Sequence, residues 1–167
     1  MTASSTNSIR ILDIRYGTSV DGPGLRTSLY CAGCENRCPG CHNPESWDEQ
    51  GGEAVPVAEL FGHIVREELN VTFTGGDPML HPEGFTTLAR LIRERTSLTI
   101  WCYTGYRFEE LLLRPAQRAL LGLVDVLVDG PFIEAERDLS LRFRGSRNQR
   151  IIDVPRSLER GEITLWQ

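Results

Sequence analysis

The sequence contains no lysine, and all 18 of its basic residues are arginine. Its 23 acidic residues give a formal net charge of -5, which argues against the basic footprint of a general nucleic-acid-binding protein. No apolar run approaches the roughly 18 residues of a membrane-spanning helix, so no membrane partner is expected. Residues 1–8 are polar and lack the layout of a signal peptide, which predicts a disordered N-terminus and a cytoplasmic protein.

The chain length and the order of its periodic segments predict one α/β domain over residues 9–167. Strand patterns occupy residues 9–15, 26–31, 70–74, 98–103 and 124–128. Helix patterns occupy residues 57–69, 82–95 and 108–121, the last of them broken at Pro115. This alternation indicates βαβ units and a parallel sheet. Because a complete (β/α)₈ barrel typically needs about 250 residues, 167 residues predict an open, partial barrel.

Unusual residues follow four of the predicted strands. The segments at these strand ends are a cysteine loop after residue 31 and residues 74–77, 103–105 and 129–131. Parallel strands present their carboxyl ends at one edge of the sheet. We therefore expect these four segments to form one site.

Four of the five cysteines lie within residues 31–41, and this crowding predicts metal binding in a reducing compartment. A structural zinc site would use two knuckles, but the two Cys-x-x-Cys pairs here are only three residues apart. A ferredoxin-like carrier would place four cysteines on one cluster and a proline after the last ligand, where Pro39 does not stand. A third interpretation uses Cys34, Cys38 and Cys41 alone and leaves one iron of a cubane cluster open. All three interpretations stay open at this point, with the third favoured.

Cys31 lies at the end of a predicted strand, on the same face as Thr27 and Leu29. A buried cysteine packs as a small hydrophobic residue, so we expect Cys31 in the core, with a fourth ligand as the alternative. Cys102 lies in an apolar strand and is also expected in the core. Gly75 and Gly76 would let backbone approach a ligand closely, and Asp77 would add a hydrogen bond to it or hold the turn.

The C-x₃-C-x₂-C spacing is similar to that of the radical S-adenosylmethionine (SAM) superfamily, and the chain closely resembles the activating proteins of anaerobic ribonucleoside-triphosphate reductase. The pieces that carry this resemblance are residues 21–26, 32–43, 73–78, 103–106, 125–132 and 145–150. The Asp-Gly-Pro-Gly and cysteine pieces are shared with other activases of glycyl-radical enzymes, such as that of pyruvate formate-lyase. The Asp-Gly-Pro-Phe and Gly-Ser-x-Asn-Gln-Arg pieces are more specific.

The resemblance implies a [4Fe–4S] cluster on Cys34, Cys38 and Cys41. It also implies reductive cleavage of SAM to a 5′-deoxyadenosyl radical, which generates a glycyl radical on the reductase. A flavodoxin-like protein would donate the electron. The expected SAM contacts are Gly40, Cys41, His42, Gly75, Gly76 and Asp77. The alternatives are activation of another glycyl-radical enzyme and a non-catalytic Fe–S or zinc module.

Two departures from the family pattern concern the same site. Gly40 stands where the superfamily often has an aromatic residue, whose role would pass to His42 or be absent. Asp77 replaces the glutamate of many relatives, which shortens the reach by one methylene. A partial barrel would also leave the site open to the partner protein. The candidate docking residues are 129–132, Arg142, Arg144, Arg147 and Arg150.

Overall fold

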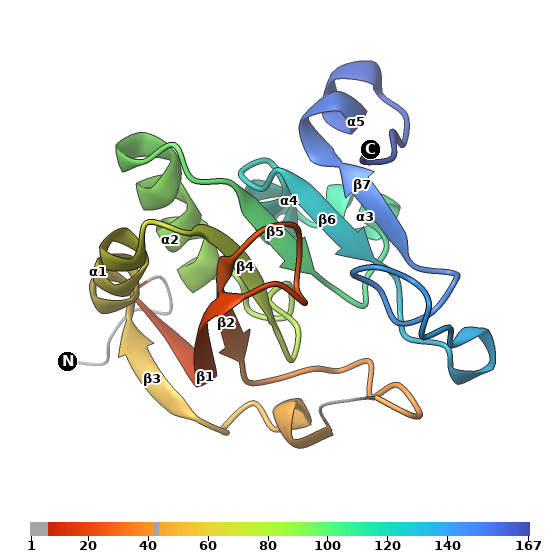
Figure 1. Cartoon of the computed structure of the whole chain (residues 1–167), viewed down its shortest axis with the longest axis horizontal. Helices are drawn as coiled ribbons and strands as arrows, with labels where there is room; N and C mark the ends of the chain where they lie inside the picture. The colour runs from red at the N-terminus through yellow and green to blue at the C-terminus, as the bar shows by residue number, and fades with distance from the viewer. Residues whose placement is uncertain (1–6, 42–43) are drawn as a thin grey trace.

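An open seven-stranded sheet, in the order β3-β1-β2-β4-β5-β6-β7, forms the centre of the computed structural model, which describes residues 7–41 and 44–167 (Figure 1). The strands are β1 Ser8–Thr18, β2 Arg26–Cys31, β3 Glu53–Pro56, β4 Asn70–Gly75, β5 Ile100–Tyr103, β6 Val126–Asp129 and β7 Arg150–Asp153. The helices are α1 Val57–Glu67, α2 Pro82–Arg95, α3 Phe108–Leu112, α4 Pro115–Leu121 and α5 Val154–Arg160. Two 3₁₀ turns, η1 Pro44–Trp47 and η2 Glu134–Glu136, complete the elements.

The sheet is parallel only in its central part. Strands β2, β4, β5 and β6 run parallel, whereas β1 is antiparallel to both β2 and β3, and β7 is antiparallel to β6. The prediction of a wholly parallel sheet is therefore wrong at both edges. A parallel neighbour needs a long crossover, but the loop between β1 and β2 is short and contains no helix.

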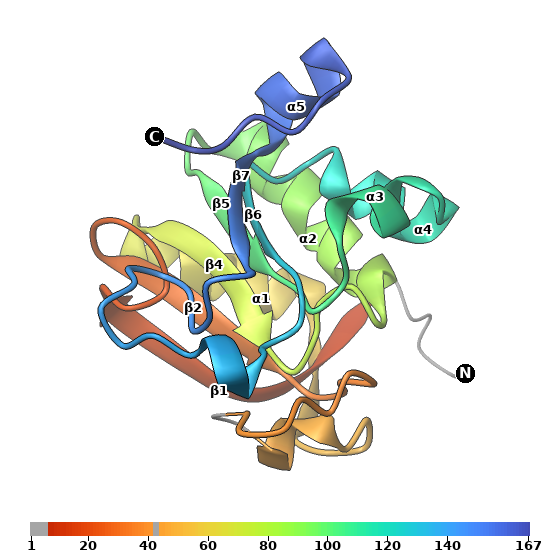
Figure 2. The same ribbon diagram turned by 90° about the vertical axis from the view of Figure 1, so that its right-hand side faces the viewer.

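One face of the sheet is covered by helices (Figure 2). Leu29, Phe73 and Leu127 are 0% exposed and belong to one core with apolar residues of α1, α2, α3 and α4. Because successive side chains of a strand point to opposite faces, these residues have neighbours that face away from the helices. The helix-covered face supplies most of the hydrophobic core.

The opposite face is partly covered by the C-terminal part of the chain. Trp101 packs edge-to-face on Phe143 and Trp166, with ring centroids 5.4 and 5.0 Å apart. Val126 and Val128 complete this smaller cluster. It closes the end of the face nearest β6 and β7 and leaves the part over β2 and β4 open for a pocket.

Several elements agree with the sequence prediction and several do not. The bounds of β2 and α2 are as predicted, and the break at Pro115 separates α3 from α4. Strand β3, strand β7 and helix α5 were not predicted. The predicted disorder of residues 1–8 is wrong at Ser8, which begins β1. Residues 1–6 lie outside the described residues.

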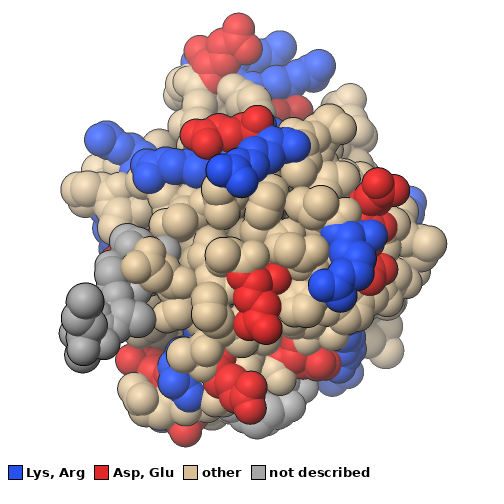
Figure 3. All heavy atoms as spheres, turned by 90° about the vertical axis from the view of Figure 1, so that its left-hand side faces the viewer, with Lys and Arg blue, Asp and Glu red and all other residues tan. Residues whose placement is uncertain are grey.

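Acidic and basic side chains are intermixed on the face shown in Figure 3. Within residues 7–41 and 44–167, no helix has the length and apolar character needed to cross a bilayer.

Candidate functional site

A pocket of about 930 Å³ lies over the open face of the sheet, at the carboxyl ends of its parallel strands. The four segments that sequence analysis placed at strand ends all contribute to its walls. The lining includes Cys34, Cys38, Cys41, Gly75, Gly76, Asp77, Tyr103, Thr104, Gly105, Gly130 and Phe132. The predicted convergence of these segments is therefore present, and residues 141–149 add a further wall.

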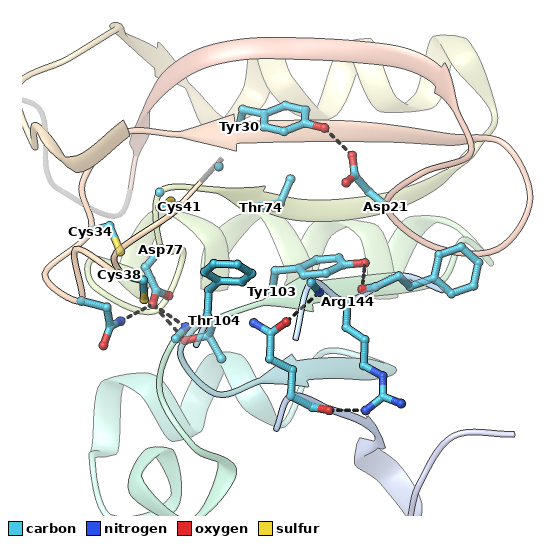
Figure 4. Close-up of a pocket in the computed structure, with 18 of the residues that line it drawn as sticks. Asp21, Tyr30, Cys34, Cys38, Cys41, Thr74, Asp77, Tyr103, Thr104 and Arg144 are labelled. Carbon is cyan, nitrogen blue, oxygen red and sulfur yellow. Dashed lines mark hydrogen bonds between the residues drawn. The ribbon is translucent and has the colours of Figure 1, made fainter. Parts of the chain in front are cut away.

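Three thiols gather at one end of the pocket (Figure 4). Cys34, Cys38 and Cys41 are half-buried, and the loop that carries them turns through left-handed backbone at Arg37 and Gly40. The N–H of Cys41 donates to the carbonyl of Cys38 at 3.0 Å, which closes the last turn of the loop. Burial raises the pKa of the Cys34 and Cys38 thiols. A positive metal centre would oppose this rise and favour deprotonation of the thiols.

The other two cysteines lie in the hydrophobic core, as predicted. Cys31 is 3% exposed and Cys102 is 0% exposed, and both face the helices. Burial raises the pKa of both thiols strongly. Cys31 points away from the pocket because it shares a strand face with Leu29.

The donor set at the pocket consists of three thiols on one short loop. Within the described part of the chain, no three His, Cys, Asp or Glu side chains converge as the ligands of one metal ion. A cubane cluster makes no such demand, because each thiolate binds a different iron. Cys34, Cys38 and Cys41 could hold such a cluster at the end of the pocket.

The glycine turn after β4 presses against the cysteine loop. A Cβ atom at Gly75 would lie 2.3 Å from the backbone nitrogen of Cys31, and one at Gly76 would lie 2.4 Å from the carbonyl oxygen of Gly33. Gly75 also has a φ of +106°, which side chains rarely adopt. Both glycines are thus required for the close packing of the turn against the end of β2 and the cysteine loop. The close approach of a ligand, predicted from the sequence, is a separate role.

Asp77 ties three loops together (Figure 4). Its Oδ1 accepts from the N–H of Met79 at 2.9 Å. Its Oδ2 accepts from the N–H of Gly105 at 2.9 Å, the hydroxyl of Thr104 at 3.1 Å and the amide of Asn36 at 3.3 Å. Burial raises the pKa of Asp77 to about 6. Of its two predicted roles, holding the turn is the one that these bonds serve.

Asp21, the first residue of the Asp-Gly-Pro-Gly-Leu-Arg motif, lines the pocket at the end away from the cysteines. The hydroxyl of Tyr30 donates to the carboxylate of Asp21 (Figure 4). The hydroxyl of Thr72 donates to the carbonyl of Asp21 at 2.8 Å, and buried Arg26 donates to that hydroxyl at 2.9 Å. Sequence analysis recognised this motif without assigning it a place, and the structure puts Asp21 and Tyr30 in the pocket wall.

An aromatic ring lies against Gly40 although no aromatic residue precedes Cys41. A Cβ atom at Gly40 would lie 3.2 Å from the ring of Phe132, which comes from the loop after β6. Sequence analysis missed this contact because the two residues are far apart in the chain. His42, the predicted substitute, lies outside the described residues.

Two of the four arginines predicted to dock a partner are engaged within the chain. Arg144 donates to the carbonyl of Gln149 at 2.6 Å, and Arg150 pairs with Asp129 and Glu109. Arg142 lies over the ring of Phe143, 4.8 Å from its centroid. Arg142 and Arg147 are exposed. Docking of a partner by the four arginines and residues 129–132 stays a prediction.

Comparison with known proteins identifies the family. The family described as 4Fe-4S single cluster domain matches residues 20–152. A protein of Haemophilus influenzae is 39% identical over 146 residues, which cover 80% of this chain and 92% of the relative. Proteins of Escherichia coli K12 and of phage T4 are each 36% identical over 142 residues, covering 78% and 79% of this chain and 89% and 86% of the relatives. All three are named anaerobic ribonucleoside-triphosphate reductase-activating protein, and the chain belongs to this family.

Proposed function

We propose that this protein is a radical SAM enzyme that activates anaerobic ribonucleoside-triphosphate reductase by generating a glycyl radical on it. One observation carries the proposal. Cys34, Cys38 and Cys41 share a pocket with the glycine turn after β4, whereas Cys31 lies in the core. A cluster held by these three thiolates would keep one iron open for a small molecule.

The open sheet is, on this proposal, a partial barrel of the radical SAM type. Its four central strands are parallel, and helices cover one face. The pocket lies over the other face, which would be the inside of the barrel. Its volume of about 930 Å³ lies within the usual range for a small-molecule site, roughly 300–1,000 Å³.

The chain's own residues would bind and orient SAM. Backbone groups of Gly40, Cys41, Gly75 and Gly76 are the candidates for the methionine end, and His42 remains a candidate contact. Asp77 would act by keeping the three surrounding loops in place, since its oxygens already accept bonds from protein donors. Tyr30 and Asp21 line the end of the pocket away from the cysteines, where the rest of an elongated ligand would extend.

The cluster, when bound, supplies one electron for the cleavage of SAM into methionine and a 5′-deoxyadenosyl radical. The protein then needs no side-chain acid or base, and its task is to hold the reactants and exclude water. A flavodoxin-like protein is the proposed reductant, and the cytoplasm is the proposed setting. The names of the relatives favour the reductase over pyruvate formate-lyase as the partner.

The first test is anaerobic reconstitution with iron and sulfide, followed by reduction and electron paramagnetic resonance with and without SAM. We expect a [4Fe–4S]⁺ signal that changes on addition of SAM, together with 5′-deoxyadenosine. Adding the anaerobic reductase should yield a glycyl radical signal, and pyruvate formate-lyase serves as the control partner. Bound zinc, or a cluster whose signal ignores SAM, would contradict the proposal.

A further inference from the structure

The two residues that follow Cys34 bind other loops with their side chains. The carboxylate of Glu35 accepts a hydrogen bond from the hydroxyl of Tyr106, in the loop after β5. The amide of Asn36 donates to Asp77 Oδ2 at 3.3 Å. The sequence analysis gave neither Glu35 nor Asn36 a role. We call Glu35 and Tyr106 the anchor, because their bond joins the cysteine loop to the loop after β5.

Tyr106 is the fixed member of the anchor. It is 5% exposed, and its ring belongs to the same core as Phe108 and Leu111 of α3. The guanidinium of Arg114 lies over the ring, 4.9 Å from its centroid. The carbonyl of Tyr106 accepts from the N–H of Gly130 at 3.0 Å. A buried ring with a polar tip holds its hydroxyl in one place, because the ring cannot move without disturbing the core.

Glu35 is the exposed member of the anchor. Water can hydrate an exposed carboxylate, so burial does not require its bond to Tyr106. The bond instead restricts the residue next to Cys34. The main chain holds the loop just before this point, where the N–H of Gly33 donates to the carbonyl of Ser46 at 2.6 Å. The anchor extends this restraint past the first cluster cysteine.

The two loops also fit closely at Gly105. A Cβ atom there would lie 2.3 Å from the amide nitrogen of Asn36. Asn36 therefore packs directly on the main chain that precedes Tyr106. Consecutive residues of the cysteine loop, Glu35 and Asn36, thus contact consecutive residues of the loop after β5. Two adjacent contacts fix the direction of the cysteine loop as well as its position.

We propose that the anchor is a positioning device for Cys34, which holds this thiol at the pocket before a cluster forms and slows the loss of iron afterwards. This inference rests on the proposed function only for the presence of a [4Fe–4S] cluster on Cys34, Cys38 and Cys41. Binding a cluster orders the loop, and ordering a free loop costs conformational entropy. A loop that is held in advance loses less entropy in this step. Glu35 and Tyr106 are positioning residues, since they act through the main chain of the loop.

The test compares two tyrosine-to-phenylalanine variants of the reconstituted protein. Tyr106→Phe removes the hydroxyl that binds Glu35 and keeps the buried ring. Tyr103→Phe is the matched control, because the hydroxyl of Tyr103 donates to a different loop, at the carbonyl of Phe143, over 2.7 Å. Each variant thus loses one hydroxyl near the end of β5. The measurement is the rate at which a chelator removes iron from the cluster, under anaerobic conditions and without SAM.

We expect Tyr106→Phe to lose iron about tenfold faster than the unaltered protein, the size expected for one hydrogen bond to a charged group. Tyr103→Phe should lose iron at the unaltered rate. An unaltered rate in Tyr106→Phe would overturn the inference and leave the proposed function intact. If the unaltered protein forms no cluster, the proposed function itself fails, and hydrogen exchange then decides whether the anchor holds the loop.

Substitutions of Glu35 separate the anchor from a general loss of stability. Glu35→Gln retains a side-chain oxygen that accepts from the Tyr106 hydroxyl, so iron should leave at close to the unaltered rate. Glu35→Leu removes the acceptor and should match Tyr106→Phe. The double variant Tyr106→Phe/Glu35→Leu should be no faster than either single variant, since both remove the same bond. Independent effects, which would multiply to about a hundredfold, would rule out the anchor.

Hydrogen exchange of the cluster-free chain covers the case in which Tyr106→Phe holds no cluster. Exchange should be faster in residues 33–38 for Tyr106→Phe and for Glu35→Leu. In Tyr103→Phe the increase should instead fall in residues 142–145, next to the lost bond at Phe143. Unchanged exchange in residues 33–38 of the two anchor variants would show that the anchor does not hold the loop, which contradicts the inference.

Discussion

The two faces of the sheet are built from alternate residues of the same strands, yet they differ in chemistry. Toward the helices point Leu29, Phe73 and Cys102, all 0% exposed. Their neighbours Tyr30, Thr74 and Tyr103 line the pocket on the other face. The comparison shows how a two-residue period places a core and a site on one set of strands.

The cysteines follow the same division. Cys31 and Cys102 face the helices and are buried, whereas Cys34, Cys38 and Cys41 lie in the loop beyond β2 and line the pocket. Only two residues lie between Cys31 and Cys34, but Cys31 packs in the core on the helix-covered face and Cys34 lines the pocket on the other face. Position relative to the sheet therefore decides which of these thiols can reach the pocket.

The largest expected effect is on cluster content, and it comes from replacing one cysteine on each side of this division by alanine. Cys34→Ala should abolish the [4Fe–4S] cluster, because a proposed iron ligand is lost. Cys31→Ala should retain it, because the core thiol faces the helices. Iron and sulfide content after reconstitution, together with the reduced-cluster signal, measures both. Loss of the cluster in Cys31→Ala at unchanged folding would contradict this division of the cysteines and indicate that Cys31 is a fourth ligand.

The second prediction uses adjacent residues of β4. Phe73→Ala should lower the free energy of unfolding by about 3–5 kcal/mol, because it removes a fully buried ring whose centroid lies 4.7 Å from that of Phe85. Thr74→Ala, on the pocket side, should cost less than about 1 kcal/mol. Urea unfolding of the cluster-free chain provides both values. Equal losses would contradict the assignment of the two faces.

The third prediction concerns the buried carboxylate at the pocket edge. Burial raises the pKa of Asp77 from its ordinary value of 3.8 to about 6, so the folded chain holds this proton more tightly than the unfolded chain. The resulting stabilisation is complete below about pH 4 and is lost as the pH rises through about 6. The free energy of unfolding should therefore fall, relative to that of Asp77→Asn, by on the order of 2–3 kcal/mol between pH 4 and pH 7.

Urea unfolding of the cluster-free chain at intervals of one pH unit measures this difference. Curves of Asp77→Asn and the unaltered protein that stay parallel across the range would show that Asp77 is not buried as described. A difference that grows in the opposite direction, toward acid pH, would show that its hydrogen bonds outweigh its burial.

The smallest expected effect distinguishes the two carboxylates bound by Arg150. The Arg150 guanidinium lowers the pKa of Glu109, so this pair stabilises the fold above the ordinary pKa of glutamate and loses that contribution as the pH falls. Glu109 is 55% exposed, and solvent screens the pair. Glu109→Gln should cost less than about 1 kcal/mol at pH 7.

Asp129, the other partner of Arg150, is 1% exposed and also accepts from the N–H of Phe108 at 2.9 Å. Asp129→Asn should therefore cost more, about 2–3 kcal/mol, since bonds to a buried charged group are lost. Thermal unfolding of the two variants side by side measures the contrast. A larger loss in Glu109→Gln than in Asp129→Asn would reverse it.

Local patterns accounted for much of the central fold. The alternation in β2 and the helical period of α2 depend on neighbours within a few residues, and both elements have the predicted bounds. Helix α5 also carries local signals that could have found it. Asp153 caps its start by accepting from the N–H of Arg156, Pro155 stands in its first turn, and Gly161 ends it in a left-handed conformation.

The edge strands had no such signal. Strands β3 and β7 lie at the two edges of the sheet, and their sequences, Glu-Ala-Val-Pro and Arg-Ile-Ile-Asp, each contain only two apolar residues between charged or proline ends. The antiparallel direction of β1 relative to β2 was indicated only by the short loop between them. The pairing of these edge strands depends on contacts with segments that are distant in the sequence.

The sequence by itself determined which residues could form the site: the spacing of Cys34, Cys38 and Cys41 and the glycine turn after β4 are properties of short segments. Only the tertiary structure decided how they are used. It placed Cys31 in the core, the Phe132 ring against Gly40, and the amide of Asn148 on the carbonyl of Pro131. These contacts join residues far apart in the chain, and they depend on which faces of the sheet the helices and loops cover, which no local pattern specifies.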